Sequence, residues 1–435
     1  MKLCMIGAGY VGLVTGTCFA DLGNKVYCVD NDIDKIRKLN SLKSIIFEPG
    51  LEELIKKNYN SGRLIFTTNI SEALKKSDII FICVGTPNIK NSLSVNLNYI
   101  FDAVRDIAKN SKIKKIIVTK STVPVGTGDE IEKILKKHNK KNYDVISNPE
   151  FLREGEAISD FRFPDRIIIG SNNKKVFKIM KNLYQPLINK GAKFFHTTRR
   201  SAELIKYASN AFLATKITFI NELSNLCEKS GINIEDISLG MGSDLRIGSR
   251  FLRAGPAFGG SCFPKDTKGL ISTGDMFNID LSIVKSVIKS NENRKSLHTK
   301  RIDSIIGKKY KKKKIAFLGV TFKPNTDDMR DSTSLSMIPY VSKKGASIFY
   351  YDPTGEKKEF KKVKNCNYVN NIKDACKNAD LIILHTEWDE FKSLDFKKLT
   401  NKKEFKVYDL RNLYDFNEML RKKIKYHSIG RPSIN

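Results

Sequence analysis

A glycine-rich turn near the N-terminus constrains the fold of this chain more than any other feature. The run Gly7-Ala8-Gly9-Tyr10-Val11-Gly12 follows a strand-like segment and opens a helix-like one, and Asp30 closes the next strand-like segment. Gly7 permits a tight turn, Gly9 lets the backbone approach a pyrophosphate, and Gly12 allows close packing of helix on strand. Asp30 would accept hydrogen bonds from an adenosine ribose and repel a 2′-phosphate. The motif therefore predicts a Rossmann-type site for NAD rather than NADP; the alternative is a tight turn without a ligand.

Strand-like and helix-like segments alternate through the first part of the chain, which is typical of an α/β fold. The predicted strands include Leu3–Ile6, Val26–Val29, Ile79–Val84, Ile116–Thr119 and Arg166–Ile169. The middle part differs. Apolar spacings predict a long helix from about Ser201 to Gly231, a glycine-rich loop from Gly240 to about Gly269, and another helix from about Leu281 to Ile306.

The last part of the chain repeats the first in the same order. Lys314–Gly319 resembles Lys2–Gly7, Ser347–Asp352 resembles Lys25–Asp30, and Ala379–Leu384 resembles Ser77–Ile82. The second half lacks the full glycine fingerprint, so we expect it to hold a different nucleotide. The sequence thus predicts an α/β protein with two Rossmann-like doubly wound parallel-sheet domains, 1–198 and 301–435, joined by a central helical region, 199–300, that carries dimer contacts and a catalytic loop.

Composition limits the class of protein. The 435 residues are 40% hydrophobic and 29% charged, as in soluble globular proteins, and no stretch approaches the roughly 20 apolar residues of a membrane helix. The N-terminus lacks the features of a signal peptide, so we expect a cytoplasmic protein without a membrane partner. The net charge of +30 raises the alternative of nucleic-acid binding. The lysines are spread along the whole chain, however, and we expect no specific nucleic acid as a binding partner.

Eight cysteines are present and no two form a CxxC pair, so we expect no metal site. Most lie in apolar runs, where a thiol packs as a small hydrophobic group. Cys262 is different, because it lies in Phe258-Gly259-Gly260-Ser261-Cys262-Phe263-Pro264-Lys265-Asp266. A thiolate beside a nicotinamide can attack an aldehyde, and hydride transfer from that adduct gives a thioester that water hydrolyses. The alternative is a buried structural cysteine.

Other polar residues stand where ligands bind in such folds. Lys206 and Asn210 are four apart on a predicted helix and could present an ammonium and an amide to an oxyanion, or could be solvated. Thr86 and Thr122 follow predicted strands, where either could line a ligand or only form a turn. Glu154 could activate water for thioester hydrolysis, or simply be a helix-start acid.

Together these segments resemble the UDP-glucose/GDP-mannose dehydrogenase family along essentially the whole chain. The carriers are GAGYVG, STVPVGT, NPEFLREG, the helix with Lys206 and Asn210, FGGSCFPKD, and the segment from Phe322 to Ser332. The segments Pro164–Ile167 and Ser249–Pro256 resemble the UDP-glucose branch more closely than the GDP-mannose branch. Arg253 departs from the family, in which an asparagine is common at this position.

The resemblance implies a four-electron oxidation of UDP-glucose with two NAD per sugar, in a homodimer whose last domain binds UDP. GDP-mannose or another nucleotide sugar is the alternative substrate. The implied catalytic residues are Cys262 as nucleophile, Lys206 and Asn210 as oxyanion stabilisers, Asp266 as organiser of water, and Glu154 and Thr122 flanking the reacting centre. The implied NAD contacts are Gly7, Gly9, Val11, Gly12, Asp30, Lys35, Thr86, Thr122, Glu154, Lys265 and Arg330. The implied substrate contacts are Glu150, Phe151, Leu152, Arg153, Glu154, Lys206, Asn210, Phe251, Leu252, Arg253, Ala254, Gly255, Gly259 and Lys323.

Two rival functions stay open on the sequence alone. A plain two-electron alcohol dehydrogenase would make Cys262 structural and would form one NADH per sugar. A basic nucleic-acid-binding protein with a vestigial NAD fold would bind DNA or RNA with a salt-sensitive affinity.

Overall fold

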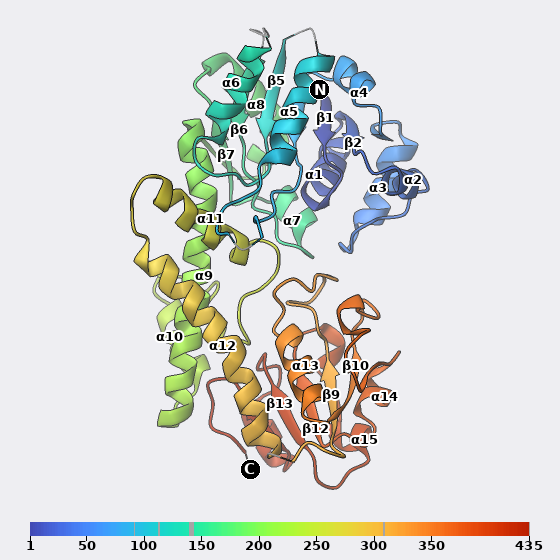
Figure 1. The fold of residues 1–435 in the computed structure, drawn as a ribbon, viewed down its shortest axis with the longest axis vertical. Helices are drawn as coiled ribbons and strands as arrows, with labels where there is room; N and C mark the ends of the chain where they lie inside the picture. Colours follow the sequence, from blue (N-terminus) through green and yellow to red (C-terminus); the bar gives the residue numbers. More distant parts are fainter. Residues whose placement is uncertain (91, 112–113, 139–142, 308, 435) are drawn as a thin grey trace. The chain divides into compact units, whose positions relative to one another are not determined.

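The computed structural model describes residues 1–90, 92–111, 114–138, 143–307 and 309–434. The chain divides into two compact units, one formed by Met1–Ser209 with Lys268–Asp280 and the other by Asn210–Thr267 with Leu281–Asn435 (Figure 1). The three-part division at residues 198 and 300 stays a prediction.

An eight-stranded sheet with the order β3-β2-β1-β4-β5-β6-β7-β8 is the centre of the first unit. All neighbouring strands in it are parallel except β6 and β7. Strands β1 and β4 are neighbours but not consecutive, which is the switch point where ligands bind in doubly wound sheets. The strands are β1 (Lys2–Ile6), β2 (Lys25–Val29), β3 (Leu64–Thr67), β4 (Ile79–Ile82), β5 (Lys115–Thr119), β6 (Tyr143–Ser147), β7 (Arg166–Gly170) and β8 (Lys193–Thr197).

Helices cover both faces of this sheet, and two separate clusters of buried apolar side chains lie between helices and strands. One cluster joins α1, α2, α3, α7 and α8 to one face, and the other joins α4, α5 and α6 to the opposite face. The helices are α1 (Tyr10–Asp21), α2 (Ile33–Asn40), α3 (Leu51–Asn60), α4 (Ile70–Lys76), α5 (Asn98–Asn110), α6 (Thr127–Lys137), α7 (Ala157–Arg162) and α8 (Lys174–Ile188). Strand side chains alternate between the clusters, since Met5 faces one and Cys4 the other.

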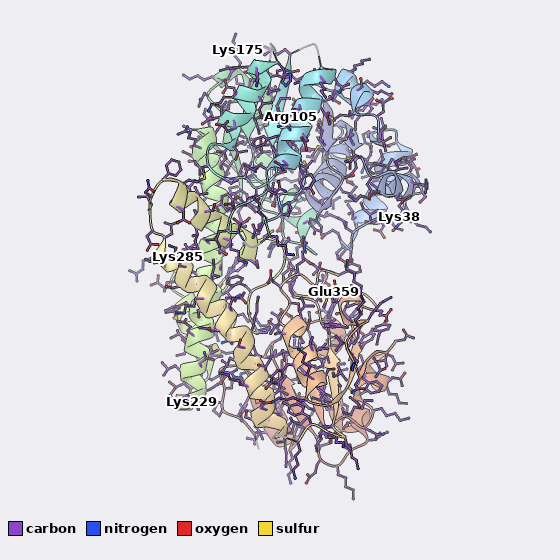
Figure 2. All side chains as sticks on the ribbon, viewed as in Figure 1. Lys38, Arg105, Lys175, Lys229, Lys285 and Glu359 are labelled. Carbon is purple, nitrogen blue, oxygen red and sulfur yellow. The ribbon has the colours of Figure 1, made fainter. Side chains whose placement is uncertain are left out.

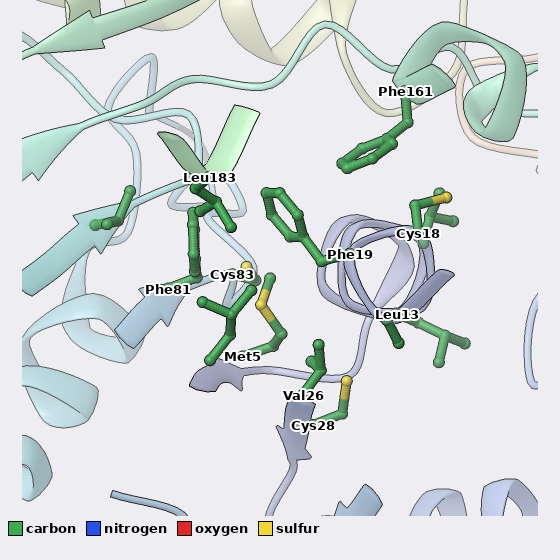
Figure 3. Close-up of a cluster of buried hydrophobic side chains, with 14 of the residues drawn as sticks. Met5, Leu13, Cys18, Phe19, Val26, Cys28, Phe81, Cys83, Phe161 and Leu183 are labelled. Carbon is green, nitrogen blue, oxygen red and sulfur yellow. The ribbon is translucent and has the colours of Figure 1, made fainter. Parts of the chain in front are cut away.

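Figure 3 shows the first of these clusters, in which Phe19 of α1 packs between Phe81 and Phe161. Cys18, Cys28 and Cys83 lie in the same cluster. Six of the eight cysteines are buried, and Cys262 and Cys366 are partly exposed. The expectation that most thiols act as small core residues is confirmed, and Cys262 is one of the two exceptions.

The second unit repeats this architecture on a smaller scale. Its six parallel strands have the order β11-β10-β9-β12-β13-β14, which matches the order of the first six strands of the other sheet. The strands are β9 (Lys314–Leu318), β10 (Ser347–Tyr351), β11 (Cys366–Tyr368), β12 (Leu381–Leu384), β13 (Lys406–Asp409) and β14 (Lys425–Ser428). Its shorter helices are α13 (Ser334–Lys343), α14 (Ile372–Cys376), α15 (Phe396–Thr400) and α16 (Phe416–Arg421). Two single-turn 3₁₀ helices, η1 (Lys358–Phe360) and η2 (Asp389–Phe391), complete it. The prediction of two Rossmann-like halves is confirmed.

Four helices form the middle of the chain: α9 (Arg199–Ser230), α10 (Ile234–Gly242), α11 (Phe263–Met276) and α12 (Ser282–Ile306). The two long helices agree with the predicted ones within two residues. The glycine-rich loop is shorter than predicted, because α11 begins at Phe263 and includes Gly269. A Cβ at Gly269 would lie 2.7 Å from the Tyr207 ring, so this glycine serves close packing within a helix rather than a turn.

Exposed lysines occur on both units, among them Lys38, Lys175, Lys229 and Lys285 (Figure 2). Within the described ranges, no helix is both long and apolar enough to cross a membrane. The same ranges hold no group of three or more histidine, cysteine, aspartate or glutamate side chains that could bind a metal ion.

Candidate active site

The glycine turn has the shape that the sequence predicts. Gly7 has a φ of 98°, and a Cβ there would lie 2.9 Å from the carbonyl oxygen of Cys83. A Cβ on Gly12 would lie 1.9 Å from the carbonyl oxygen of Gly7, so only glycine fits. Nothing lies within 4 Å of a Cβ built on Gly9, which leaves its backbone open for a ligand.

Helix α1 begins directly after this turn, and no side chain caps its first turn. Unpaired backbone N–H groups at a helix N-terminus attract an anion such as a pyrophosphate. Asp30 follows β2, and its Oδ2 accepts a hydrogen bond of 2.9 Å from the backbone N–H of Ala8. Lys35 Nζ lies 3.7 Å from Asp30 Oδ1. An uncapped helix, an open glycine and an acid after β2 fit the pyrophosphate and adenosine groups of NAD.

Two threonines meet beyond the ends of β4 and β5. Thr86 Oγ1 donates a hydrogen bond of 3.0 Å to the backbone carbonyl of Thr122, and both residues are buried. The bond fixes the two loops to each other at the carboxyl edge of the sheet, where we predicted a ligand. Val11 lies in the first turn of α1 and is partly buried.

A buried ion pair joins the loop after β6 to helix α9. Lys206 Nζ lies 3.2 Å from Glu150 Oε1, and both side chains are at most 6% exposed. Glu150 Oε2 also accepts a 2.5 Å hydrogen bond from the backbone N–H of Leu152. The alternative of a solvated Lys206 is excluded, since the ammonium is buried and paired. Buried ionic groups of this kind cluster at functional sites.

The neighbouring side chains of this loop are also fixed. Arg166 stacks over the Phe151 ring at 3.9 Å, and Lys206 Nζ lies 5.2 Å from the same ring. The Arg153 guanidinium pairs with Asp160 at 2.7 Å. The predicted substrate contact of Arg153 therefore falls on a side chain that already has a partner in α7.

The same loop is fastened to the start of α1. Gly155 has a φ of 80°, and its backbone N–H donates 2.6 Å to Glu48 Oε2. Glu48 also bonds the Tyr10 hydroxyl and the backbone N–H of Ala157. The backbone next to Glu154 is thereby connected to the glycine turn before α1. Glu154 therefore lies at the same edge of the sheet as that turn.

In the second unit, Cys262 lies at the junction of a glycine turn and a helix. Its carbonyl accepts a 2.7 Å hydrogen bond from the backbone N–H of Asp266, which is the first helical bond of α11. The thiol is partly exposed and lies 3.5 Å from Ser261 Oγ. A helix N-terminus favours a negative charge, so this position suits a reactive thiolate better than the apolar core does. It is not walled off in apolar packing.

The glycines before Cys262 are required by close contacts. A Cβ on Gly259 would lie 2.7 Å from the carbonyl oxygen of Asp331. Gly260 has a φ of 79°, and a Cβ there would lie 2.6 Å from the Phe322 ring. The backbone N–H of Gly260 donates 2.8 Å to the carbonyl of Arg330. The segment that carries Lys323 and Arg330 thus packs against the glycines that precede Cys262.

A buried carboxylate lies one turn into α11. Asp266 is fully buried, and its Oδ2 accepts a 2.6 Å hydrogen bond from Asn210 Nδ2 while its Oδ1 pairs with Lys265 Nζ at 2.5 Å. The Lys265 ammonium is therefore engaged with Asp266. The structure brings together the Asp266 carboxylate of α11 and the Asn210 amide of α9.

The predicted substrate loop is held by buried polar groups. Gly255 donates 2.9 Å from its N–H to Asn221 and accepts 2.7 Å from Arg294, and Arg253 donates 2.7 Å to the carbonyl of Arg411. Phe251 has a φ of 66°, a backbone conformation that a non-glycine residue adopts only under constraint. Leu252 and Ala254 are buried. This strained, fixed loop is of the kind that lines ligand sites.

The predicted residues thus form two groups. The first unit holds Gly7, Gly9, Val11, Gly12, Asp30, Lys35, Thr86, Thr122, Glu150–Glu154 and Lys206. The second unit holds Asn210, Phe251–Gly255, Gly259, Cys262, Lys265, Asp266, Lys323 and Arg330. Lys206 and Asn210 lie on one helix, four residues apart, and the division between the units falls between them.

Sequence reasoning missed several buried polar groups. Lys120 and Tyr184 both bond Asn148 Oδ1, and Glu48 holds the loop at Gly155. Lys120 directly precedes the predicted Ser121–Gly126 loop, and that position at the end of a buried strand was the signal available.

Models of one protein family match most of the chain, domain by domain. The family model for the NAD binding domain of the UDP-glucose/GDP-mannose dehydrogenase family matches residues 1–188, its central domain matches 200–293, and its UDP binding domain matches 316–416. This chain belongs to that family. It is an NAD-dependent dehydrogenase with a UDP-sugar-binding domain.

Named relatives of the family resemble this chain over its full length. A UDP-glucose 6-dehydrogenase of Rhizobium meliloti is 47% identical over 99% of this chain and 100% of its own length. One from Bacillus subtilis is 42% identical over 100% of this chain and 94% of its own. The solved structure of a UDP-glucose dehydrogenase from Pyrobaculum islandicum has a TM-score of 0.89 at 33% identity, covering 98% of this chain and 96% of that one.

Proposed function

We propose that this member of the family oxidises the C6 alcohol of UDP-glucose to the carboxylate of UDP-glucuronate. The observation that carries the proposal is the setting of Cys262, a partly exposed thiol at the N-terminus of α11 beside the Asn210–Asp266 pair. Full-length likeness to enzymes named UDP-glucose 6-dehydrogenase supports the choice of sugar. The overall reaction converts one alcohol, two NAD⁺ and one water into one carboxylate, two NADH and three protons.

NAD, when bound, supplies the hydride acceptor for both oxidations. The glycine turn and the start of α1 would hold its pyrophosphate, with Asp30 and Lys35 at its adenosine end and Thr86, Thr122 and Glu154 toward its reactive end. We assign Lys265 and Arg330 to the same cofactor as proposals from the family resemblance.

In the first oxidation the alcohol loses a hydride and a proton and becomes an aldehyde. Lys206 and Asn210 would stabilise the negative charge that develops on the alcohol oxygen, because an ammonium and an amide N–H both donate to an oxyanion. The buried setting of Lys206 makes its charge more effective than a solvated lysine would be.

In the second oxidation the Cys262 sulfur attacks the aldehyde carbon and forms a thiohemiacetal. Loss of a second hydride from that carbon gives a thioester, and water then adds to it and releases the carboxylate and the thiol. Asp266 would orient this water, and Glu154 would accept its proton. The covalent bond keeps the aldehyde on the enzyme between the two steps.

The sugar is set by the loops that line the substrate. We assign Glu150–Glu154, Phe251–Gly255, Gly259 and Lys323 to substrate contact. Purified protein should therefore be tested with UDP-glucose, UDP-galactose, UDP-N-acetylmannosamine and GDP-mannose, with kcat/KM measured for each. We expect UDP-glucose to exceed GDP-mannose by at least 10²-fold. A preference for GDP-mannose would contradict the proposal and support its alternative.

A homodimer is the assembly that we propose. Phe212, Phe219 and Leu226 recur every seven residues along α9 and are 65%, 49% and 61% exposed. Seven residues bring a helix back to nearly the same face, so the three side chains form one apolar stripe, which we call the α9 stripe. An exposed apolar stripe on a long helix favours burial against a second copy of the chain. The cytoplasmic location stays a prediction.

A further inference from the structure

Lys120 is a buried lysine that the proposed mechanism does not use. It follows β5 and is 6% exposed, and its Nζ donates 3.2 Å to Asn148 Oδ1 and lies 3.4 Å from the Tyr184 hydroxyl. Tyr184 itself donates 2.6 Å to the same Asn148 oxygen. Both partners are neutral. A buried ammonium without a hydrogen-bonded carboxylate is costly, so a structural role alone would be served by an uncharged side chain.

The charged neighbours of Lys120 connect it to the candidate active site. Asn148 begins the segment Asn148–Glu150, and Asn148 Nδ2 donates 2.8 Å to the carbonyl of Ile168. The charged groups that act on Lys120 are Glu150 after β6 and Lys206 on α9. Cys83 after β4 also faces it, but burial raises the pKa of that thiol to about 12 and keeps it neutral. Glu150 is the carboxylate that pairs with Lys206 at 3.2 Å. One buried carboxylate therefore interacts with two buried ammonium groups.

We propose that Lys120 is a positioning residue for the oxidation: it fixes the Asn148–Glu150 segment and shares the field of Glu150 with Lys206. This rests on the proposed role of Lys206 at the alcohol oxygen. While Lys120 is charged, Glu150 holds Lys206 in place without fully neutralising it, so that the Lys206 ammonium stays available to the substrate oxygen. When Lys120 loses its proton, it no longer shares the negative charge of Glu150. Glu150 then neutralises more of the Lys206 charge, and less of that charge acts on the substrate oxygen.

The protonation of Lys120 changes in an accessible pH range. Burial lowers its pKa to about 8, and the charge of Lys206 adds to this while Glu150 opposes it. We therefore expect kcat of the wild-type protein to decline between pH 7 and 9, with a midpoint near 8.

Two substitutions separate charge from packing. Lys120→Met keeps most of the side-chain volume and removes the charge, and we expect kcat at pH 7 to fall at least 10-fold with no decline centred near pH 8. Lys120→Arg keeps a charge that does not titrate between pH 7 and 9. We expect its kcat at pH 7 to lie between those of Lys120→Met and wild type, and to stay constant up to pH 9. A Lys120→Met protein with kcat within twofold of wild type, or with the same midpoint, would overturn the proposal.

Should both variants fold poorly, Tyr184→Phe leaves the charge in place and removes one hydrogen-bond partner. The midpoint of the kcat decline should then move to lower pH, because the ammonium is less well solvated; an unchanged midpoint would count against Lys120 as its source.

An activity-independent measurement keeps this inference distinct from the proposed function. Because the pKa of Lys120 is lower in the folded than in the unfolded chain, the folded form gains stability as pH rises from about 8 toward 10.5. The Tm of wild type relative to Lys120→Met should rise over that range, and a constant difference would contradict the buried charge. If UDP-glucose is not oxidised at all, the proposed function fails, while the Tm comparison still tests Lys120 and the kcat profile is taken with whichever sugar of the panel reacts.

Discussion

At the scale of single residues, Cys262 differs from the other cysteines in its setting. Its place after Gly259 and Gly260 was readable from the sequence, but the same letters also fit a buried structural thiol. Six cysteines are buried in the described structure, whereas Cys262 is partly exposed at a helix N-terminus, which argues against the buried structural thiol. Its role as the nucleophile stays a prediction.

Replacing this thiol should separate the two oxidations. We expect Cys262→Ser to lower UDP-glucuronate formation by about 10³-fold or more, because a hydroxyl is a far weaker nucleophile than a thiolate at neutral pH. Residual turnover should release aldehyde with one NADH per sugar. Product analysis by mass spectrometry checks this, with Cys366→Ser, the other partly exposed thiol, as the matched control. Unchanged UDP-glucuronate formation would exclude Cys262 as the nucleophile.

Asp30 sets the choice of cofactor in this account. We expect Asp30→Ala to raise the KM for NAD about 10-fold and to narrow the preference for NAD over NADP, since a ribose hydrogen-bond acceptor and a negative charge are both lost. Steady-state kinetics with both cofactors measure this. Asp34→Ala is the control, because Asp34 pairs with Arg37 at the surface. Equal effects of the two substitutions would argue against Asp30 at the ribose.

The groups that sequence reasoning missed at this scale are buried polar ones. A lysine at position 120 or a glutamate at 48 is usually solvated, and neither residue type nor spacing shows that a side chain is enclosed. The glycine turn was predictable because Gly7 and Gly12 are required by close contacts within the turn and with the neighbouring strand. Lys120 and Glu48 depend on partners that lie 28 or more residues away along the chain.

At the scale of secondary-structure elements, buried caps connect helices to one another. Helix α6 follows Gly126, and the backbone N–H groups of Gly126 and Gly128 donate 2.7 and 2.9 Å to the Glu203 carboxylate of α9. Ser147 Oγ donates 3.0 Å to the same carboxylate. Glu203 therefore satisfies the start of one helix from the first turns of another.

Removing that charge should destabilise the first unit. We expect Glu203→Gln to lower the free energy of unfolding by about 2 kcal/mol, because the amide nitrogen would face donors that need an acceptor. Urea unfolding followed by circular dichroism measures this. Glu130→Gln, on the exposed face of α6, is the matched control and should change little. A loss at Glu203 no larger than at Glu130 would contradict the capping role.

The predicted bounds of helices and strands agree with the structure where the hydrophobic pattern extends over many residues. The helix predicted from 201 to 231 runs from 199 to 230, and the strand at Val26–Val29 extends by one residue to Lys25. The length of the glycine-rich loop was overestimated, because glycine disfavours helices and Gly269 was therefore assigned to the loop. Its true constraint is the Tyr207 ring, a contact between residues 62 positions apart that no local pattern reveals.

At the scale of the whole molecule, the repeat was the most informative feature. Three pairs of similar segments, in the same order in both halves of the chain, predicted a second Rossmann-like sheet. The strand orders of the two sheets agree. The net charge of +30 did not by itself indicate a partner.

The α9 stripe yields a prediction about assembly. We expect wild-type protein to elute at the mass of a dimer in size-exclusion chromatography with light scattering, and Phe219→Glu to shift it toward the monomer, because a buried carboxylate without a partner is costly. Lys229→Ala, an exposed change on the same helix, should leave the dimer intact. A wild-type monomer, or a dimer unaffected by Phe219→Glu, would contradict the stripe as the contact.

The proposed reaction requires that Cys262 captures the aldehyde and that the aldehyde is oxidised a second time before it leaves. Its most direct test is the amount of NADH formed when a limiting, known quantity of UDP-glucose is consumed with NAD in excess. We expect two NADH per UDP-glucose, with UDP-glucuronate as the product. One NADH per sugar, with free aldehyde in solution, would contradict it.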